Sequence, residues 1–156
     1  MLSIHIIAVG KDKDSWITDQ SEHFTKLISK YARLDITTIP EEKYTKTTDI
    51  KKAIESEAST ILSRHRGGLL VALDVKGESY STEQLADKLR RIQVGRHSTI
   101  EFAIGGPHGL GASLLKIADL RMSLSPLTLS HQIVRLVLLE QLYRVLNLNA
   151  GGSYHK

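Results

Sequence analysis

The sequence of 156 residues has no cysteine, and it also lacks a long hydrophobic run and a basic leader. The absence of cysteine excludes a disulfide framework, a thiolate nucleophile, a zinc ribbon and an iron–sulfur cluster, and it suits a reducing compartment. None of these is needed for stability, because a chain of this length buries roughly 70% of its unfolded surface on folding. A small secreted protein held by disulfides is therefore excluded.

Two of these absences concern targeting and membranes. The start of the chain is apolar up to Gly10, but it carries His5 and runs directly into the charged residues 11–14, so we do not expect a signal peptide. No run of about 18 apolar residues occurs, because polar and charged residues interrupt even the segment 133–148. We expect a soluble cytoplasmic protein with no membrane partner.

The net charge is small, at +4. A basic excess of this size permits contact with nucleic acid through phosphates, but it is also common among proteins that bind none. Charge alone therefore decides little about function.

Five apolar runs of strand length alternate with segments of helical periodicity. The predicted strands cover residues 2–9, 34–39, 69–75, 99–104 and 120–124. Amphipathic stripes predict helices over residues 16–31, 50–62 and 85–92, which start at Asp14, at Asp49 and at a capping box of Ser81 and Gln84. This alternation favours an α/β fold with a parallel sheet flanked by helices. No linker or repeat divides the chain, so residues 1–156 are expected to form a single domain.

A last helix, predicted over residues 131–146 with Ser130 as its cap, is apolar on nearly every side. Such a helix must be covered on several faces, so we predict a homodimer formed through it. Arg135 lies near the start of this helix. It either pairs with a carboxylate or faces a cleft and binds an anion, and the sequence leaves both alternatives open.

Ligands of a parallel sheet bind beyond the carboxyl ends of its strands, so the loops after strands are the candidate sites. The first loop, residues 10–14, lacks the second and third glycines of a dinucleotide fingerprint, which argues against a nicotinamide cofactor. Glycines instead cluster at residues 105–111, after the fourth strand. There they either form a plain tight turn or allow a ligand to approach the backbone closely.

Residues 124–131 mix leucines with small hydroxyl side chains and carry no formal charge. Such a segment suits an uncharged aromatic ring, for example an adenine held by backbone groups between apolar walls. The alternative is a buried loop in front of the last helix. The seven histidines include no pair at the helical spacing of metal ligands, so we predict no bound metal.

The tail, residues 149–156, ends on Tyr154, His155 and Lys156 after two glycines. It either frays in solvent or forms an RNA-binding flap, because Tyr and His stack on bases and Lys contacts phosphate.

Together these segments resemble a known family over essentially the whole chain. The resemblance rests on Ile7-Ala8-Val9-Gly10, Leu73-Asp74 with Gly77, Ile104-Gly105-Gly106, Ser123-Leu124-Ser125, Thr128 to Arg135, Glu140 to Arg144, and Tyr154-His155-Lys156. In this order they make the sequence similar to the ribosomal large subunit methyltransferase H family, which is a branch of the SPOUT methyltransferases. The sequence departs from the family's pattern at Ser130, where the family usually has proline.

The resemblance implies an S-adenosylmethionine-dependent enzyme that methylates N3 of a pseudouridine in 23S rRNA. Its target would be a stem-loop at the subunit interface, and the enzyme would act on assembled 70S ribosomes. The resemblance also implies a SPOUT-type α/β knot, in which the C-terminal chain is threaded into a trefoil knot.

The resemblance also implies site residues. Those expected to bind the cofactor are Leu73, Gly105, Leu124, Ser125, Pro126, Leu127, Thr128 and Leu129. Those expected to be catalytic are His131, Arg135, Tyr154 and His155. We expect Arg135 to stabilise the base or its phosphate, His131 or His155 to accept or relay the proton of N3, and Tyr154 to position the base. In a dimer, the tail of one subunit would complete the site of the other.

Three alternatives remain open. One is another SPOUT RNA methyltransferase, such as one that methylates the ribose 2'-oxygen of tRNA, and a second is a ribosome-binding protein that has lost catalysis. The third, an oxidoreductase that binds a nucleotide cofactor, is disfavoured by the missing glycines of the first loop.

Overall fold

The structure is a computed structural model that describes residues 1–95 and 98–155. Its elements are β1 (Leu2–Val9), α1 (Ser15–Ile28), β2 (Ala32–Ile39), a 3-10 turn (Thr47–Asp49), α2 (Ile50–Arg64), β3 (Leu69–Ser79), α3 (Thr82–Val94), β4 (Thr99–Ile104), α4 (Ala112–Ile117), β5 (Leu120–Ser123) and α5 (His131–Asn149). All five predicted strands are present. The short helix α4 was not expected, and β3 continues past the predicted end of its apolar run.

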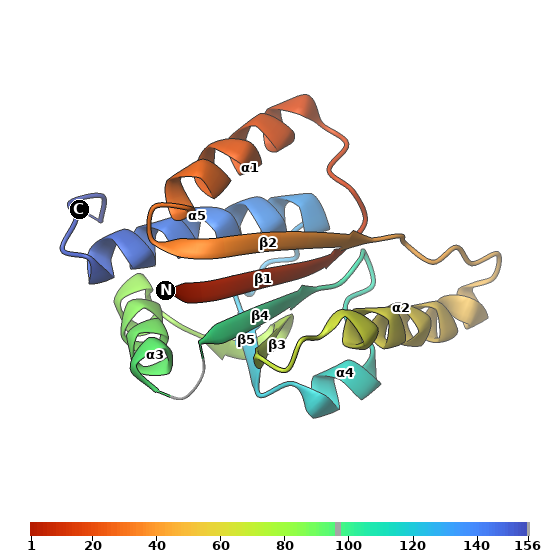
Figure 1. The fold of residues 1–156 in the computed structure, drawn as a ribbon. Coiled ribbons are helices and arrows are strands. Elements are labelled where there is room, and N and C mark those ends of the chain that lie inside the picture. The colour runs from red at the N-terminus through yellow and green to blue at the C-terminus, as the bar shows by residue number, and fades with distance from the viewer. Residues whose placement is uncertain (96–97, 156) are drawn as a thin grey trace.

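The strands form one parallel sheet in the order β2-β1-β4-β3-β5 (Figure 1). In this figure β1, β2 and β4 run from left to right, and their carboxyl ends share the right-hand edge. Helix α5 begins near that edge and runs back toward the opposite one, where the C-terminal residues lie. The parallel sheet flanked by helices is confirmed. The trefoil knot stays a prediction.

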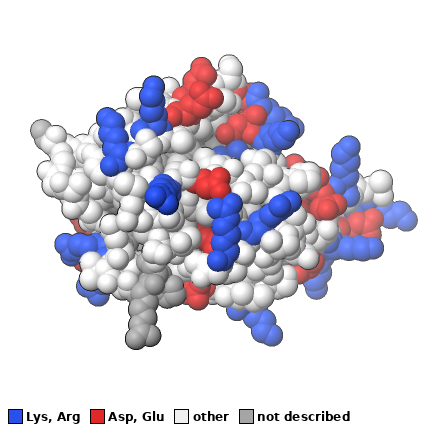
Figure 2. Space-filling model, viewed as in Figure 1, with Lys and Arg blue, Asp and Glu red and all other residues white. Residues whose placement is uncertain are grey.

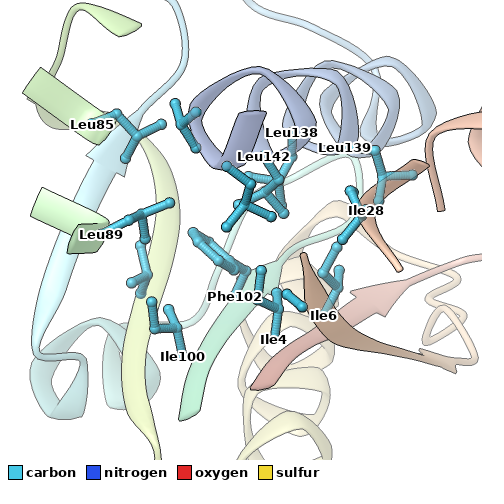
Figure 3. Close-up of a cluster of buried hydrophobic side chains, with 14 of the residues drawn as sticks. Ile4, Ile6, Ile28, Leu85, Leu89, Ile100, Phe102, Leu138, Leu139 and Leu142 are labelled. Carbon is cyan, nitrogen blue, oxygen red and sulfur yellow. The ribbon is translucent and has the colours of Figure 1, made fainter. Parts of the chain in front are cut away.

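Alternating side chains of the strands divide the core between the two faces of the sheet. Ile4 and Ile6 of β1 belong to the larger cluster, which also includes Phe102 of β4 and residues of α1, α3 and α5 (Figure 3). Ile7 and Val9 point the other way, into a smaller cluster with α2 and α4. The apolar run of β1 is continuous because both of its faces are buried.

Much of the apolar surface of α5 is covered within one chain. Leu138, Leu139, Leu142 and Val145 are fully buried against the sheet and its neighbouring helices. The helix packs against both α1 and α3. A partly buried apolar strip remains on α5, formed by Ile133, Leu136 and Val137. Along the described ranges, no helix is both long and apolar enough to cross a membrane.

The capping predictions have mixed outcomes. The box of Ser81 and Gln84 is present, with both reciprocal hydrogen bonds, and the Ser130 side chain accepts from the amide of Ile133. Asp14 and Asp49 occupy N-cap positions, but the prediction that their side chains cap was wrong. Asp49 has a helical backbone because the 3-10 turn precedes it, whereas a capping side chain needs an extended backbone. At Asp14 the backbone oxygen accepts instead, from the amide and the hydroxyl of Thr18.

Candidate active site

A bulge in β3 shapes the carboxyl edge of the sheet. Leu73 and Glu78 both pair with Met122 of β5, so residues 74–77 loop out between them. A Cβ atom at Gly77 would lie only 2.6 Å from the backbone carbon and oxygen of Arg121, so glycine is required there. Two nitrogens of the Arg121 guanidinium donate to Asp74 Oδ2, at 3.1 and 2.5 Å, and this ion pair ties the bulge to β5.

The bulge forms one wall of a narrow cavity, and the loop after β5 forms the other. The lining residues are Leu73, Asp74, Val75, Met122, Ser123, Leu124, Ser125, Leu127, Leu129 and Val134. Five of the residues expected to bind a cofactor are therefore brought together: Leu73, Leu124, Ser125, Leu127 and Leu129. Val134 of α5 and Met122 of β5 also line the cavity, and no motif in the sequence marks either of them.

The other three expected cofactor residues are not among the described residues that line the cavity. Pro126 and Thr128 are exposed on the outer side of the loop. Gly105 is buried in the turn after β4, where a Cβ atom would lie 2.5 Å from the Gly109 oxygen. The amide of Gly109, which has a φ of +84°, donates to the Gly106 oxygen at 3.0 Å. The glycine cluster thus forms a tight turn that leads into α4.

Two serines organise the loop that closes the cavity. The Ser123 hydroxyl donates to the backbone carbonyl oxygen of Ser125 at 2.9 Å. The backbone amide of Leu127 donates to the side-chain hydroxyl of Ser125 at 3.0 Å. The walls are leucine and valine side chains, and the one carboxylate, Asp74, is already paired. These residues fit a flat, uncharged ring such as adenine. The cavity measures about 60 Å³, below the ~300 Å³ of small ligand pockets, so the loop must open to admit one.

His131 and Arg135 lie at the start of α5, beside the end of β1. Arg135 Nη2 donates to the Gly10 oxygen at 2.6 Å, and Nη1 lies 3.2 Å from Asp12 Oδ1. Arg135 therefore pairs with a carboxylate, which was one of the two alternatives left open. The buried Nε2 of His131 has no hydrogen-bond partner in residues 1–95 and 98–155. It faces Gly10, where a Cβ atom would lie 3.0 Å away.

Tyr154 and His155 lie beyond the opposite end of α5, in a tail that packs on the protein. The ring of Tyr154 lies 4.6 Å from that of Tyr143, and its amide donates to Asn147 Oδ1 at 3.0 Å. Burial and then the Glu140 carboxylate raise the pKa of the Tyr154 hydroxyl, so it stays protonated at neutral pH. The tail is docked, not frayed. Lys156 lies outside the described residues.

His155 also has a fixed position, because its Nε2 lies 2.8 Å from Glu83 Oε1 at the start of α3. The Glu83 backbone amide and the His155 side chain, in that order, lower the pKa of Glu83 to about 2. The two pairs of expected catalytic residues are separated by α5, whose 19 residues span roughly 27 Å. One chain therefore does not bring all four together.

Comparisons with known proteins identify the class to which this fold belongs. A family model described as "Predicted SPOUT methyltransferase" matches residues 2–155. A probable methyltransferase from Bordetella pertussis Tohama I has a similar fold, with a TM-score of 0.54, 12% identity and 93% of each chain covered. A probable methylase family protein from Haemophilus influenzae Rd KW20 gives a TM-score of 0.52 at 10% identity, over 99% of this chain and 70% of that one. The fold is thus that of a SPOUT methyltransferase.

Two relatives narrow the assignment. A protein of Alkaliphilus oremlandii (strain OhILAs) is 40% identical, with 99% of this chain and all of that one covered. A protein of Heliobacterium modesticaldum (strain ATCC 51547 / Ice1) is 39% identical over the full length of both chains. Both are named ribosomal RNA large subunit methyltransferase H. The chain belongs to this family of SPOUT methyltransferases.

The cofactor of SPOUT methyltransferases is S-adenosylmethionine, which supplies an electrophilic methyl group on a sulfonium centre when bound. The residues that would hold its adenine are those of the leucine-lined cavity, above all Leu73, Leu124 and Leu129. Backbone groups of the loop around Ser125 would meet the polar edge of the ring. The role of residues 124–129 in cofactor binding stays a prediction.

Proposed function

We propose that this protein methylates N3 of a pseudouridine in 23S rRNA, with S-adenosylmethionine as the donor and the assembled 70S ribosome as the substrate. The observation that carries the proposal is the leucine-lined cavity at the carboxyl edge of the sheet. It occurs in a chain whose full-length relatives are named for the large-subunit RNA. The reaction needs a methyl donor held in line with N3 and a route for the N3 proton.

The groups at the start of α5 suit the second requirement. Loss of the N3 proton leaves negative charge on the base, which the positive charge of Arg135 stabilises. Arg135 is 4% exposed and anchored to Gly10 and Asp12, so the guanidinium is fixed in position. The free Nε2 of His131 is available to accept or relay the proton.

A homodimer would bring the tail into the same site. The apolar strip of Ile133, Leu136 and Val137 gives α5 a surface for a second copy of the chain. If two α5 helices pair in opposite directions, the end that carries Tyr154 in one subunit lies near Arg135 of the other. Tyr154 would then position the base, and His155 would share in the proton transfer.

Shape would contribute more to RNA selection than charge. The face in Figure 2 carries basic and acidic side chains interspersed with one another, without a single basic field. Basic side chains are also paired in ion pairs, as Arg66 is with Asp35 and Arg121 is with Asp74. Selectivity therefore rests on the ribosomal surface that both subunits contact.

The test is the transfer of labelled methyl groups from S-adenosylmethionine to ribosomes that lack the modification, followed by mass analysis of the nucleosides. We expect the label in 3-methylpseudouridine of 23S rRNA. Label on a ribose 2'-oxygen or in tRNA would instead favour another SPOUT activity. Failure to bind S-adenosylmethionine would favour a ribosome-binding protein without catalysis.

Variants of Arg135 test its role in the same assay. Arg135→Ala is expected to lower turnover about 100-fold or more while cofactor binding stays measurable, because the charge that stabilises the base is lost. Arg33→Ala, at an exposed position of β2, is the matched control and should keep full activity. Unchanged turnover in Arg135→Ala would contradict the assigned role.

A further inference from the structure

A second cavity lies beside Arg135, which is not among the described residues that line the cofactor cavity. It measures about 490 Å³, within the usual range of ligand sites. Its walls come from the loop after β1, from α1, from β2 and from α5. Hydroxyl side chains of Thr18, Ser21 and Thr25 line it at helical spacing along α1. The two cavities have no lining residue in common among those described.

Polar atoms without partners surround this cavity. Arg135 is 4% exposed and Ser21 is 9% exposed, yet Arg135 Nε and Ser21 Oγ make no hydrogen bond within the described part of the chain. Asp12 Oδ1 likewise accepts no hydrogen bond there, although Arg135 Nη1 lies 3.2 Å away. Buried groups left in this state are costly, which points to a ligand that satisfies them.

The charges of the cavity indicate what kind of ligand that is. The acidic Asp12 and Glu22 balance the basic Lys26 and Arg135, so the cavity is not built for a phosphate. The free Arg135 Nε donates, Asp12 Oδ1 accepts and the Ser21 hydroxyl does either. These three groups complement the edge of an uncharged ring that presents a hydrogen-bond donor beside an acceptor. Ile36 provides an apolar surface on which such a ring can pack.

We propose that this cavity binds an unpaired base of the RNA substrate, at a nucleotide close to the methyl acceptor but distinct from it. The inference rests on the proposed function, which supplies RNA as the ligand. Unpaired RNA bases carry such an edge and are recognised when they are splayed out of a helix. The acceptor itself does not fit here, because an N–H bound by Asp12 is not free to take a methyl group. The methyl donor would be held in the other cavity, which Val134 lines.

The direct test uses uridine and 3-methyluridine, which differ only in the N–H that the second one lacks. Titration of the labelled full-length protein with uridine is expected to shift the amide resonances of Thr18, Ser21 and Thr25. 3-Methyluridine and inorganic phosphate are expected to leave them unchanged. Equal shifts with both nucleosides, shifts elsewhere, or none at the solubility limit would overturn the proposal.

Substitutions test whether uridine binds in this cavity. Ser21→Ala is expected to weaken uridine binding about fivefold, because one hydrogen bond is lost. Ser63→Ala removes an exposed hydroxyl on α2 and should leave binding unchanged. An equal loss in both variants, or none in Ser21→Ala, would count against the site.

The ribosome assay separates this base from the acceptor. Ser21→Ala is expected to raise KM for ribosomes and to leave kcat unchanged, because its contact lies away from the reacting atoms. A fall in kcat instead would show that the acceptor itself occupies the cavity. If uridine binds at Ser21 but no 3-methylpseudouridine forms, the proposed function fails and the base site stands. If methylation proceeds without a uridine shift, the base site fails alone.

Discussion

At the scale of single residues, the most enclosed charge lies far from the proposed site. Glu101 of β4 is fully buried, and the Nδ1 atoms of His5 and His65 lie 3.1 Å from its two oxygens. The amides of Gly68 and Arg66 donate to it at 2.8 and 3.0 Å. Burial, the largest single influence, raises the pKa of Glu101, but these donors together outweigh it, so the pKa is lowered.

Glu101→Gln is expected to destabilise the protein in a pH-dependent way. Because the folded-state pKa lies below the ordinary value of 4.5, the ionised carboxylate stabilises the fold above that value. This contribution is lost as the pH falls through the folded-state pKa. Urea unfolding at neutral pH should show a loss of about 2 kcal/mol in the variant, and a flatter decline in acid than the original chain shows. Glu41→Gln is the exposed control, and parallel acid declines in all three proteins would contradict the assignment.

Single side-chain contacts were predicted from the sequence only in part. The composition of residues 124–131 suggested apolar walls for a ring, whereas Leu73 was expected in the cofactor site only through the family resemblance. The partners of Glu101 lie at positions 5, 65, 66 and 68. Strand register places His5 beside Glu101, and the residues between α2 and β3 supply the others. The pairing of Arg135 with Asp12 was likewise not predicted, because the two residues are far apart in the sequence and no local pattern connects them.

At the scale of elements, the caps of α3 and α5 make a matched pair. Ser81 takes part in two hydrogen bonds, from Gln84 N to its hydroxyl at 3.2 Å and from its own amide to Gln84 Oε1 at 2.8 Å. Ser130 takes part in one, at 3.4 Å. Ser81→Ala should therefore lower the free energy of unfolding by about 1 kcal/mol, and Ser130→Ala by only a few tenths. Urea unfolding measures both, and the reverse order would show that the box contributes little.

Elements with a strong apolar period were predicted, whereas short or exposed ones were not. α4 has six residues and begins after Gly111 without a capping side chain, so no sequence signal marked it. β3 extends to Ser79 because β5 pairs with its exposed end beyond the bulge. The docked tail depends on Asn147 and Tyr143 of α5, contacts that no local pattern predicts.

At the scale of the whole molecule, the direction of α5 separates the two halves of the proposed site. The sequence predicted parallel strands with crossover helices, but the order β2-β1-β4-β3-β5 required the structure. Periodicity gives the length and the faces of an element, not its neighbours. The predicted span of the last helix already put Arg135 and the tail at its opposite ends, but the packing of α5 on α1 and α3 required the structure.

Mixed dimers test whether two chains share a site. Arg135→Ala and a chain that ends at Ser153 should each be inactive alone, because each lacks one half of every site. Mixed and allowed to exchange subunits, they should recover about a quarter of the original activity, since half of the dimers then hold one complete site. Methyl transfer after mixing is the measurement. No recovery, with exchange confirmed by mass, would show that each chain works with its own residues.

The position of α5 in the chain also affects how the protein is made. The larger core lies between the sheet and α1, α3 and α5, and α5 supplies its residues from positions 131–149. During synthesis, every strand is complete before this helix exists. The apolar face around Phe102 therefore stays open on the growing chain until the helix emerges, a period in which exposed apolar surface invites aggregation. Demand for a chaperone should be greatest on nascent chains that stop just short of residue 131.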